Sequence, residues 1–171
     1  MPNCELEDLT IYAEKTAEAL IEKLKTLSFK LALAESCTAG MISSLLANTA
    51  GASSVLWGSF VCYTQEAKVS MLGLDDGKLS AYGLVSRETA VSMAEGALQK
   101  SGANLAAAVT GLAGPDGDGS NVPVGTVWVA VTAQNGGTTA REFHFTGCRN
   151  TVRLRAAIAV LESIQTLLTK E

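Results

Sequence analysis

The sequence has few groups that could hold a metal ion or bind nucleic acid. Only one histidine, His144, occurs among 171 residues, and no two cysteines form a Cys-x-x-Cys pair. Because zinc sites are built from closely spaced Cys and His ligands, we expect no metal site. Thirteen lysines and arginines stand against seventeen aspartates and glutamates, and no basic cluster occurs. A net charge of −4 without such a cluster argues against nucleic acid as a partner.

Long hydrophobic segments are also absent. The longest apolar run, residues 156–161, is far shorter than the ~20 residues that span a membrane. The first eight residues are acidic, where a secretory signal would be basic and then apolar. We therefore expect a cytoplasmic protein without a membrane partner, in which most cysteines are buried free thiols. The cysteines are Cys4, Cys37, Cys62 and Cys148.

Hydrophobic patterning indicates a single domain in which helices alternate with strands. Apolar residues make up 47% of the chain and charged residues 18%, as in compact globular proteins. Helices are expected over residues 13–27, 38–47, 65–72 and 86–100 and from about 150 onward. Strands are expected over residues 31–34, 55–63, 105–110, 124–133 and 138–146. The last two form a hairpin at Asn135-Gly136, so the pattern predicts a helix–sheet–helix sandwich with a mixed sheet over residues 1–171.

The first junction with candidate chemistry follows the strand predicted at residues 31–34. In open α/β sheets, ligands bind beyond the carboxyl ends of the strands. Ser36 lies between that strand and the start of a helix, where unpaired N–H groups could stabilise an oxyanion. Ser36 is therefore a candidate nucleophile. Alternatively, Ser36 or Thr38 only caps the helix.

The second junction, Tyr63 to Lys68, offers a base for such a serine. His144 lies inside a predicted hairpin strand and is expected to be an ordinary strand residue. Lys68 falls in the first turn of the next helix, where burial, with Arg149 close in the fold, would favour the neutral amine that a base requires. A tyrosine at the end of a strand and a surface lysine are also common, so this pair by itself leaves a structural role open.

The third junction is a glycine-rich loop, residues 110–120. Its backbone N–H groups could surround a phosphate. The spacing of Asp116, Asp118 and Ser120 is similar to the start of a calcium loop, but Val127 stands where a bidentate glutamate is needed. Arg149, just before the last helix, could bind a phosphate or carboxylate, or could simply be solvated.

Four ordered motifs resemble one known family. They are Ala34-Glu35-Ser36-Cys37-Thr38-Ala39-Gly40, Tyr63-Thr64-Gln65-Glu66-Ala67-Lys68, Thr110-Gly111-Leu112-Ala113-Gly114-Pro115-Asp116-Gly117 and Pro123-Val124-Gly125-Thr126-Val127. Together they are similar to the CinA C-terminal domain family, also known as nicotinamide-nucleotide amidase (PncC). The resemblance extends over about residues 6–168 and is closest to the stand-alone form, without the molybdopterin-binding-like domain of longer CinA proteins.

The resemblance implies a three-layer α/β/α sandwich with a mixed, mostly parallel sheet and a late β-hairpin. It also implies hydrolysis of nicotinamide mononucleotide to nicotinate mononucleotide and ammonia, with no cofactor. The implied catalytic residues are Ser36 as nucleophile, Lys68 as base and Tyr63 as an assisting group. Substrate contacts are expected from the same motifs and from the arginine that follows the last strand. These are Thr38, Ala39, Gly40, Thr110, Gly111, Gly114 and Arg149.

The sequence departs from the family pattern at one position and leaves a second class of function open. The family's arginine usually follows Gly-Asp, whereas here Gly147-Cys148 precedes Arg149. The alternative is a non-catalytic nucleotide-binding or regulatory module linked to competence or DNA damage. For either function we expect a small-molecule nucleotide as the ligand and a homo-oligomer, most simply a dimer.

Overall fold

The computed structural model describes the backbone of residues 2–169 and the side chains of residues 5–169. These residues form six helices and five strands, with one short 3₁₀ turn, Ala52–Ser54. The helices are α1 Pro2–Leu27, α2 Met41–Ala47, α3 Gln65–Leu72, α4 Asp76–Tyr82, α5 Arg87–Ser101 and α6 Arg149–Leu167. The strands are β1 Leu31–Glu35, β2 Leu56–Val61, β3 Leu105–Gly111, β4 Thr126–Ala133 and β5 Thr138–His144.

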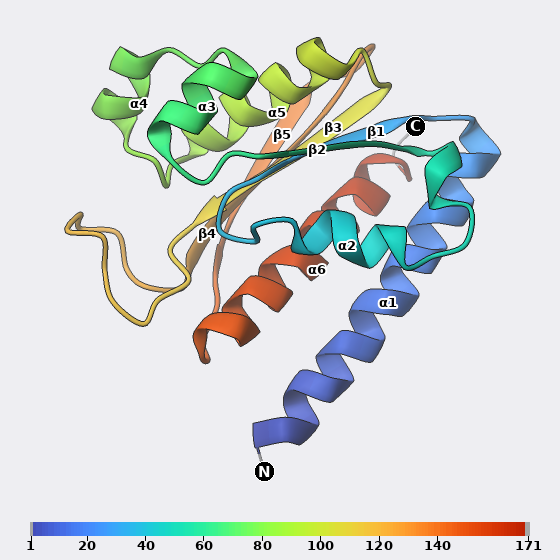
Figure 1. Cartoon of the computed structure of the whole chain (residues 1–171), viewed down its shortest axis with the longest axis horizontal. Coiled ribbons are helices and arrows are strands. Elements are labelled where there is room, and N and C mark those ends of the chain that lie inside the picture. The colour runs from blue at the N-terminus through green and yellow to red at the C-terminus, as the bar shows by residue number, and fades with distance from the viewer. Residues whose placement is uncertain (1, 170–171) are drawn as a thin grey trace.

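The five strands form one mixed sheet in the order β2-β1-β3-β4-β5. The β1–β2 and β1–β3 pairs are parallel, while β4 runs antiparallel to both β3 and β5. Helices α1, α2 and α6 cover one face, and α3, α4 and α5 cover the other (Figure 1). The expected three-layer α/β/α sandwich with a late hairpin is therefore confirmed.

Side-chain size differs between the two faces of the central strands. Leu31 and Leu33 of β1 point into the core beneath α1 and α6, whereas Ala32 and Ala34 point toward α5. All four side chains have no exposed surface. Because successive residues of a strand alternate between faces, this Leu/Ala pattern places bulk on one face and lets α5 pack closely on the other.

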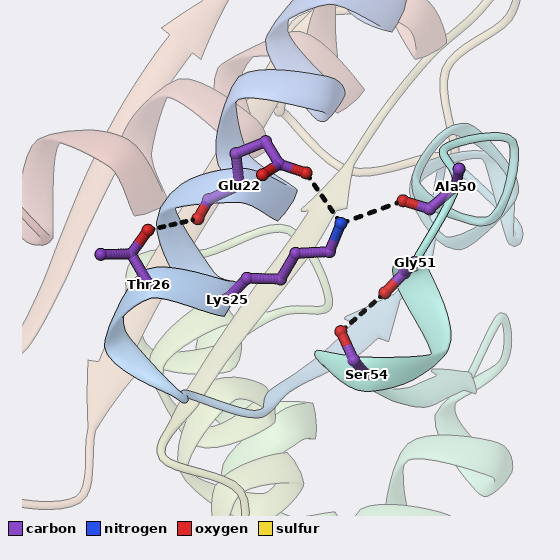
Figure 2. Close-up of polar contacts among 6 residues, drawn as sticks. All are labelled: Glu22, Lys25, Thr26, Ala50, Gly51 and Ser54. Atoms are coloured by element: carbon purple, nitrogen blue, oxygen red, sulfur yellow. Dashed lines mark hydrogen bonds and ion pairs between the residues drawn. The ribbon is translucent and has the colours of Figure 1, made fainter.

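A cluster of hydrogen bonds connects the end of α1 to the loop between α2 and β2 (Figure 2). The Lys25 Nζ donates to Glu22 Oε1 at 2.7 Å and to the Ala50 carbonyl at 3.2 Å. Gly51 has a φ of +84°, and a Cβ at this position would lie 2.4 Å from Lys25 Nζ. Glycine here permits both the left-handed turn and the close approach of the lysine.

The structure differs from the sequence prediction in three helices and one cysteine. Helix α1 begins at Pro2 rather than at residue 13. Helix α2 begins at Met41 rather than at residue 38, because Ala39 and Gly40 adopt left-handed conformations with φ of 50° and 89°. Helix α4 was not predicted; its single buried side chain is Leu79, so its apolar periodicity is weak. Cys37 and Cys62 are buried as expected, Cys148 is exposed, and the Cys4 side chain lies outside the described residues.

Candidate active site

The predicted junctions lie at one edge of the sheet. Strands β1, β2 and β3 run parallel, so Ser36, the segment after β2 and the loop after β3 all leave from their carboxyl ends. Strand β5 ends at the same edge because it is antiparallel to β4, which places the start of α6 there as well. The edge therefore gathers segments separated by more than a hundred residues in the sequence.

A buried carboxylate shapes the turn that carries Ser36. Glu35, the last residue of β1, has no exposed surface. Its two oxygens accept hydrogen bonds from the hydroxyls of Thr38 and Ser59, at 2.8 and 3.0 Å. They also accept from three backbone N–H groups, those of Gly40, Ile42 and Ser43. The carboxylate thus takes the place of a helix cap at the start of α2 and fixes the turn between β1 and that helix.

Lys68 approaches Ser36 from the next junction. Thr64 caps α3 by accepting from the Ala67 N–H at 3.2 Å, which places Lys68 on the buried face of the helix, one turn before Leu72. The Lys68 Nζ lies 3.1 Å from Ser36 Oγ and donates to the Cys62 carbonyl at 3.0 Å. Lys68 is only 1% exposed.

The surroundings of Lys68 favour the neutral amine. Burial lowers the pKa of Lys68 below that of an ordinary lysine, while the Cys62 and Cys37 thiols act in the opposite direction. Burial, rather than the positive charge of Arg149, is the cause. Burial also raises the pKa of Cys37 to about 12, so this neighbour of Ser36 stays a thiol. A neutral lysine beside a serine hydroxyl can act as a general base.

Tyr63 and Arg149 form a second contact at this edge. The Arg149 guanidinium donates to the Tyr63 hydroxyl and to the Gly114 carbonyl, both at 2.6 Å. This contact joins the end of β2, the glycine-rich loop and the start of α6. The Tyr63 hydroxyl accepts from Arg149, and its role as a group that assists Ser36 stays a prediction.

A cavity of about 190 Å³ lies among these groups. Its lining includes Ser36, Lys68, Tyr63 and Arg149, together with the start of the glycine-rich loop. A larger cavity of about 310 Å³ lies between β5 and α6, but neither Ser36 nor Lys68 lines it. The smaller cavity therefore marks the candidate site.

The expected substrate-binding residues occupy different positions around this cavity. Thr110 and Gly111 line it, although the Thr110 hydroxyl already donates to the Leu84 carbonyl at 2.6 Å. Gly114 offers its carbonyl to Arg149. Thr38, Ala39 and Gly40 are not in the cavity lining; they form the turn behind Ser36, and the Thr38 hydroxyl is bonded to Glu35.

Two residues that hold this turn, Glu35 and Arg153, were not predicted from the sequence. Arg153 donates to the Cys37 carbonyl at 3.1 Å and to the Thr38 carbonyl at 2.7 Å. Arg153 stands four residues after Arg149, on the same face of α6, and this spacing was the available signal. Within the part of the chain that the structure describes, no group of three or more His, Cys, Asp or Glu residues could hold a metal ion.

The fold and the site define an α/β protein with a serine–lysine pair at the carboxyl edge of its sheet. The sequence profile of the CinA C-terminal domain matches residues 13–168, and the chain belongs to this family. CinA-like proteins of Thermotoga neapolitana and Mycobacterium tuberculosis are 41% and 39% identical to it, over 89% and 93% of the chain. The chain spans 37% of the length of each of these relatives.

Solved structures of the same superfamily share the fold. The competence/damage-inducible protein CihA of Agrobacterium tumefaciens is 41% identical, with a TM-score of 0.88 over 91% of this chain and 94% of that one. A CinA superfamily protein of Klebsiella pneumoniae is 27% identical, with a TM-score of 0.90 over 93% and 99% of the two chains. None of the described helices is long and apolar enough to cross a membrane.

Proposed function

We propose that this protein hydrolyses the carboxamide of nicotinamide mononucleotide, forming nicotinate mononucleotide and ammonia by a serine–lysine mechanism. The observation that carries the proposal is the contact between Lys68 Nζ and Ser36 Oγ, 3.1 Å long, inside a cavity open to a small ligand. Burying a lysine until it is 1% exposed costs free energy, and ionisable groups buried at this cost cluster at functional sites. Activation of a neighbouring hydroxyl is one role for such a lysine.

In the proposed reaction the neutral Lys68 amine takes the Ser36 proton while Oγ adds to the carboxamide carbon. The carbonyl electron pair moves to oxygen and forms a tetrahedral intermediate. Collapse of that intermediate breaks the C–N bond, and the Lys68 ammonium returns its proton to the departing ammonia. Water, deprotonated by Lys68, then attacks the Ser36 ester, releases nicotinate mononucleotide and restores the serine hydroxyl.

The size of the cavity supports binding of the pyridine ring and its carboxamide, with the ribose phosphate outside. About 190 Å³ is less than the roughly 300 Å³ at which ligand pockets usually begin. In this arrangement the phosphate would lie toward Arg149 and the N–H groups of the loop that begins at Thr110 and Gly111. Gly114 and Tyr63 would hold Arg149 in place through the two bonds that they accept.

The proposal is tested by ammonia release from nicotinamide mononucleotide, measured on the purified protein and on the Ser36→Ala variant. The wild type should release ammonia and nicotinate mononucleotide in equal amounts. Ser36→Ala should fold, since Ser36 accepts no cap bond at α2, and should release neither product. Binding of the nucleotide without release by the wild type would instead support the regulatory module. Near-normal release by Ser36→Ala would exclude the serine mechanism.

A further inference from the structure

Arg153 holds the backbone that directly follows Ser36. This half-buried side chain reaches from α6 to the turn after β1, where its Nε donates to the Cys37 carbonyl and its Nη2 to the Thr38 carbonyl. The bonds are 3.1 and 2.7 Å long and join residues more than a hundred positions apart. Both carbonyls belong to the turn that carries Ser36, and the mechanism above assigns no role to this arginine.

All but two of the N–H groups in this turn donate to another residue. The Ser36 N–H donates to the Val109 carbonyl, and the Ala39 N–H donates to the Ser36 carbonyl. The next four N–H groups donate to the Glu35 carboxylate or to the Thr38 carbonyl; they belong to Gly40, Met41, Ile42 and Ser43. The N–H groups of Cys37 and Thr38 donate to no other residue among those described, and the Cys37 N–H contacts only its own thiol, a weak acceptor.

These two N–H groups, which bond no other residue, stand in a buried environment. Thr38 has no exposed surface, and Cys37 is 5% exposed and lines the cavity beside Ser36. A buried donor without a strong acceptor costs free energy, and proteins rarely retain one without a reason. An oxygen atom of a ligand that arrives beside Ser36 Oγ would supply the missing acceptor.

The planarity of the peptide bond links Arg153 to these donors. In a trans peptide unit the carbonyl and the N–H point in opposite directions, so a fixed carbonyl also fixes the N–H. The Cys37 carbonyl shares its unit with the Thr38 N–H, and Arg153 holds that carbonyl. The Thr38 carbonyl, also held by Arg153, shares its unit with the Ala39 N–H. The Ala39 N–H in turn donates to the Ser36 carbonyl. Because the Ser36 carbonyl shares its peptide unit with the Cys37 N–H, this bond also orients the Cys37 N–H.

We propose that Arg153 is a positioning residue that orients the N–H groups of Cys37 and Thr38 as an oxyanion hole for Ser36. When Oγ adds to a carbonyl carbon, the carbonyl π electrons move to oxygen, and the two N–H groups donate to the resulting oxyanion. Arg153 itself exchanges no proton and touches no reacting atom. The inference rests on the proposed function for its substrate, but requires only that Ser36 acts as a nucleophile.

The test replaces Arg153 by alanine and uses Arg155→Ala as the matched control. Arg155 is a half-buried arginine on the same helix, but it bonds the Thr146 carbonyl and Glu5 instead. Arg153→Ala should lower kcat by roughly 10–100-fold and leave KM for nicotinamide mononucleotide unchanged, because an oxyanion exists only beyond the ground state. Added guanidinium, at concentrations too low to unfold the protein, should restore much of the lost kcat. Arg155→Ala should keep kcat near that of the wild type.

A second readout separates this inference from the choice of substrate. Phosphonylation of Ser36 by a fluorophosphonate, followed by mass spectrometry, also needs the nucleophile and the oxyanion donors but no nucleotide. If the wild type is labelled but does not hydrolyse nicotinamide mononucleotide, slower labelling of Arg153→Ala still supports the inference while the proposed function fails.

Three results would overturn the inference. Equal labelling and turnover of Arg153→Ala and wild type would exclude any role for the arginine, while the proposed function would stand. A loss of kcat that guanidinium does not restore, or one that Arg155→Ala matches, would reduce Arg153 to a structural contact. A wild-type Ser36 that is neither labelled nor active would remove both the inference and the proposed function.

Discussion

At the scale of single residues, the proposed chemistry depends on the burial of the Lys68 side chain, which is 1% exposed. Burial lowers the pKa of Lys68, so its neutral form becomes available at lower pH than for a lysine in water, which titrates near ~10.4. Because the neutral amine is the active form, kcat/KM should rise with pH through this lowered pKa. The rising limb should therefore lie at lower pH than the titration of a lysine in water.

The pH profile of kcat/KM for nicotinamide mononucleotide checks this expectation, since it reports groups of the free enzyme. Tyr63→Phe is the control, because the Tyr63 hydroxyl contacts Arg149 rather than Lys68. That variant should keep the position of the rising limb even if its rate falls. A limb centred near the pKa of a lysine in water would mean that Lys68 is not the base.

The sequence was sufficient to nominate Ser36 and Lys68 but not the residues that hold them. Ser36 stands directly after the buried strand β1, Lys68 lies in the helix that follows β2, and parallel strands bring their carboxyl ends together. Glu35 and Arg153 could not be assigned in this way. The role of Glu35 depends on five donors contributed by two segments, and that of Arg153 on a contact across more than a hundred residues. No local pattern encodes such contacts.

At the scale of elements, a carboxylate replaces the cap of a seven-residue helix, α2. Glu35→Gln should lower the free energy of unfolding by about 3 kcal/mol, because an amide offers one acceptor oxygen in place of two charged ones and leaves buried N–H groups unpaired. Urea denaturation of the variant and the wild type measures this difference.

Glu22→Gln provides the matched control for this substitution. Glu22 is a solvent-exposed carboxylate bonded to Lys25 in the cluster of Figure 2, and such exposed pairs contribute little stability, about 0–1 kcal/mol. If Glu35→Gln costs no more than Glu22→Gln, the carboxylate does not hold the turn after β1.

Elements with strong local signals were predicted closely, and those shaped by distant contacts were not. Helix α3 spans Gln65–Leu72 as predicted, since Thr64 supplies a cap and Gly73 a left-handed end. Helix α2 begins three residues later than predicted, because the Glu35 side chain accepts hydrogen bonds from Gly40 and later N–H groups and holds this segment as a turn. Helix α4 buries only Leu79, so its sequence shows little apolar periodicity, and Gly77 within it has a low helix propensity. Neither feature predicts a helix.

At the scale of the whole molecule, the parallel strands bring the residues of the candidate site together at the carboxyl edge of the sheet. Among the described residues, no cluster of His, Cys, Asp and Glu side chains could hold a metal ion. The proposed reaction uses a serine and an amine where other hydrolases use metal-activated water. Ammonia release from nicotinamide mononucleotide should be unchanged after treatment with excess EDTA. Loss of release, with recovery on adding a divalent cation, would contradict the mechanism.

The serine–lysine pair is tested most directly by Lys68→Arg, which keeps the positive charge but provides no base near neutral pH. Initial rates of ammonia release from nicotinamide mononucleotide are compared for wild type and variant at the same neutral pH, with folding checked by circular dichroism. A general base contributes roughly 10²–10⁴-fold to the rate, so a folded Lys68→Arg should be slower by about that factor. Near-normal turnover by Lys68→Arg would show that position 68 supplies only positive charge, and would contradict the serine–lysine mechanism.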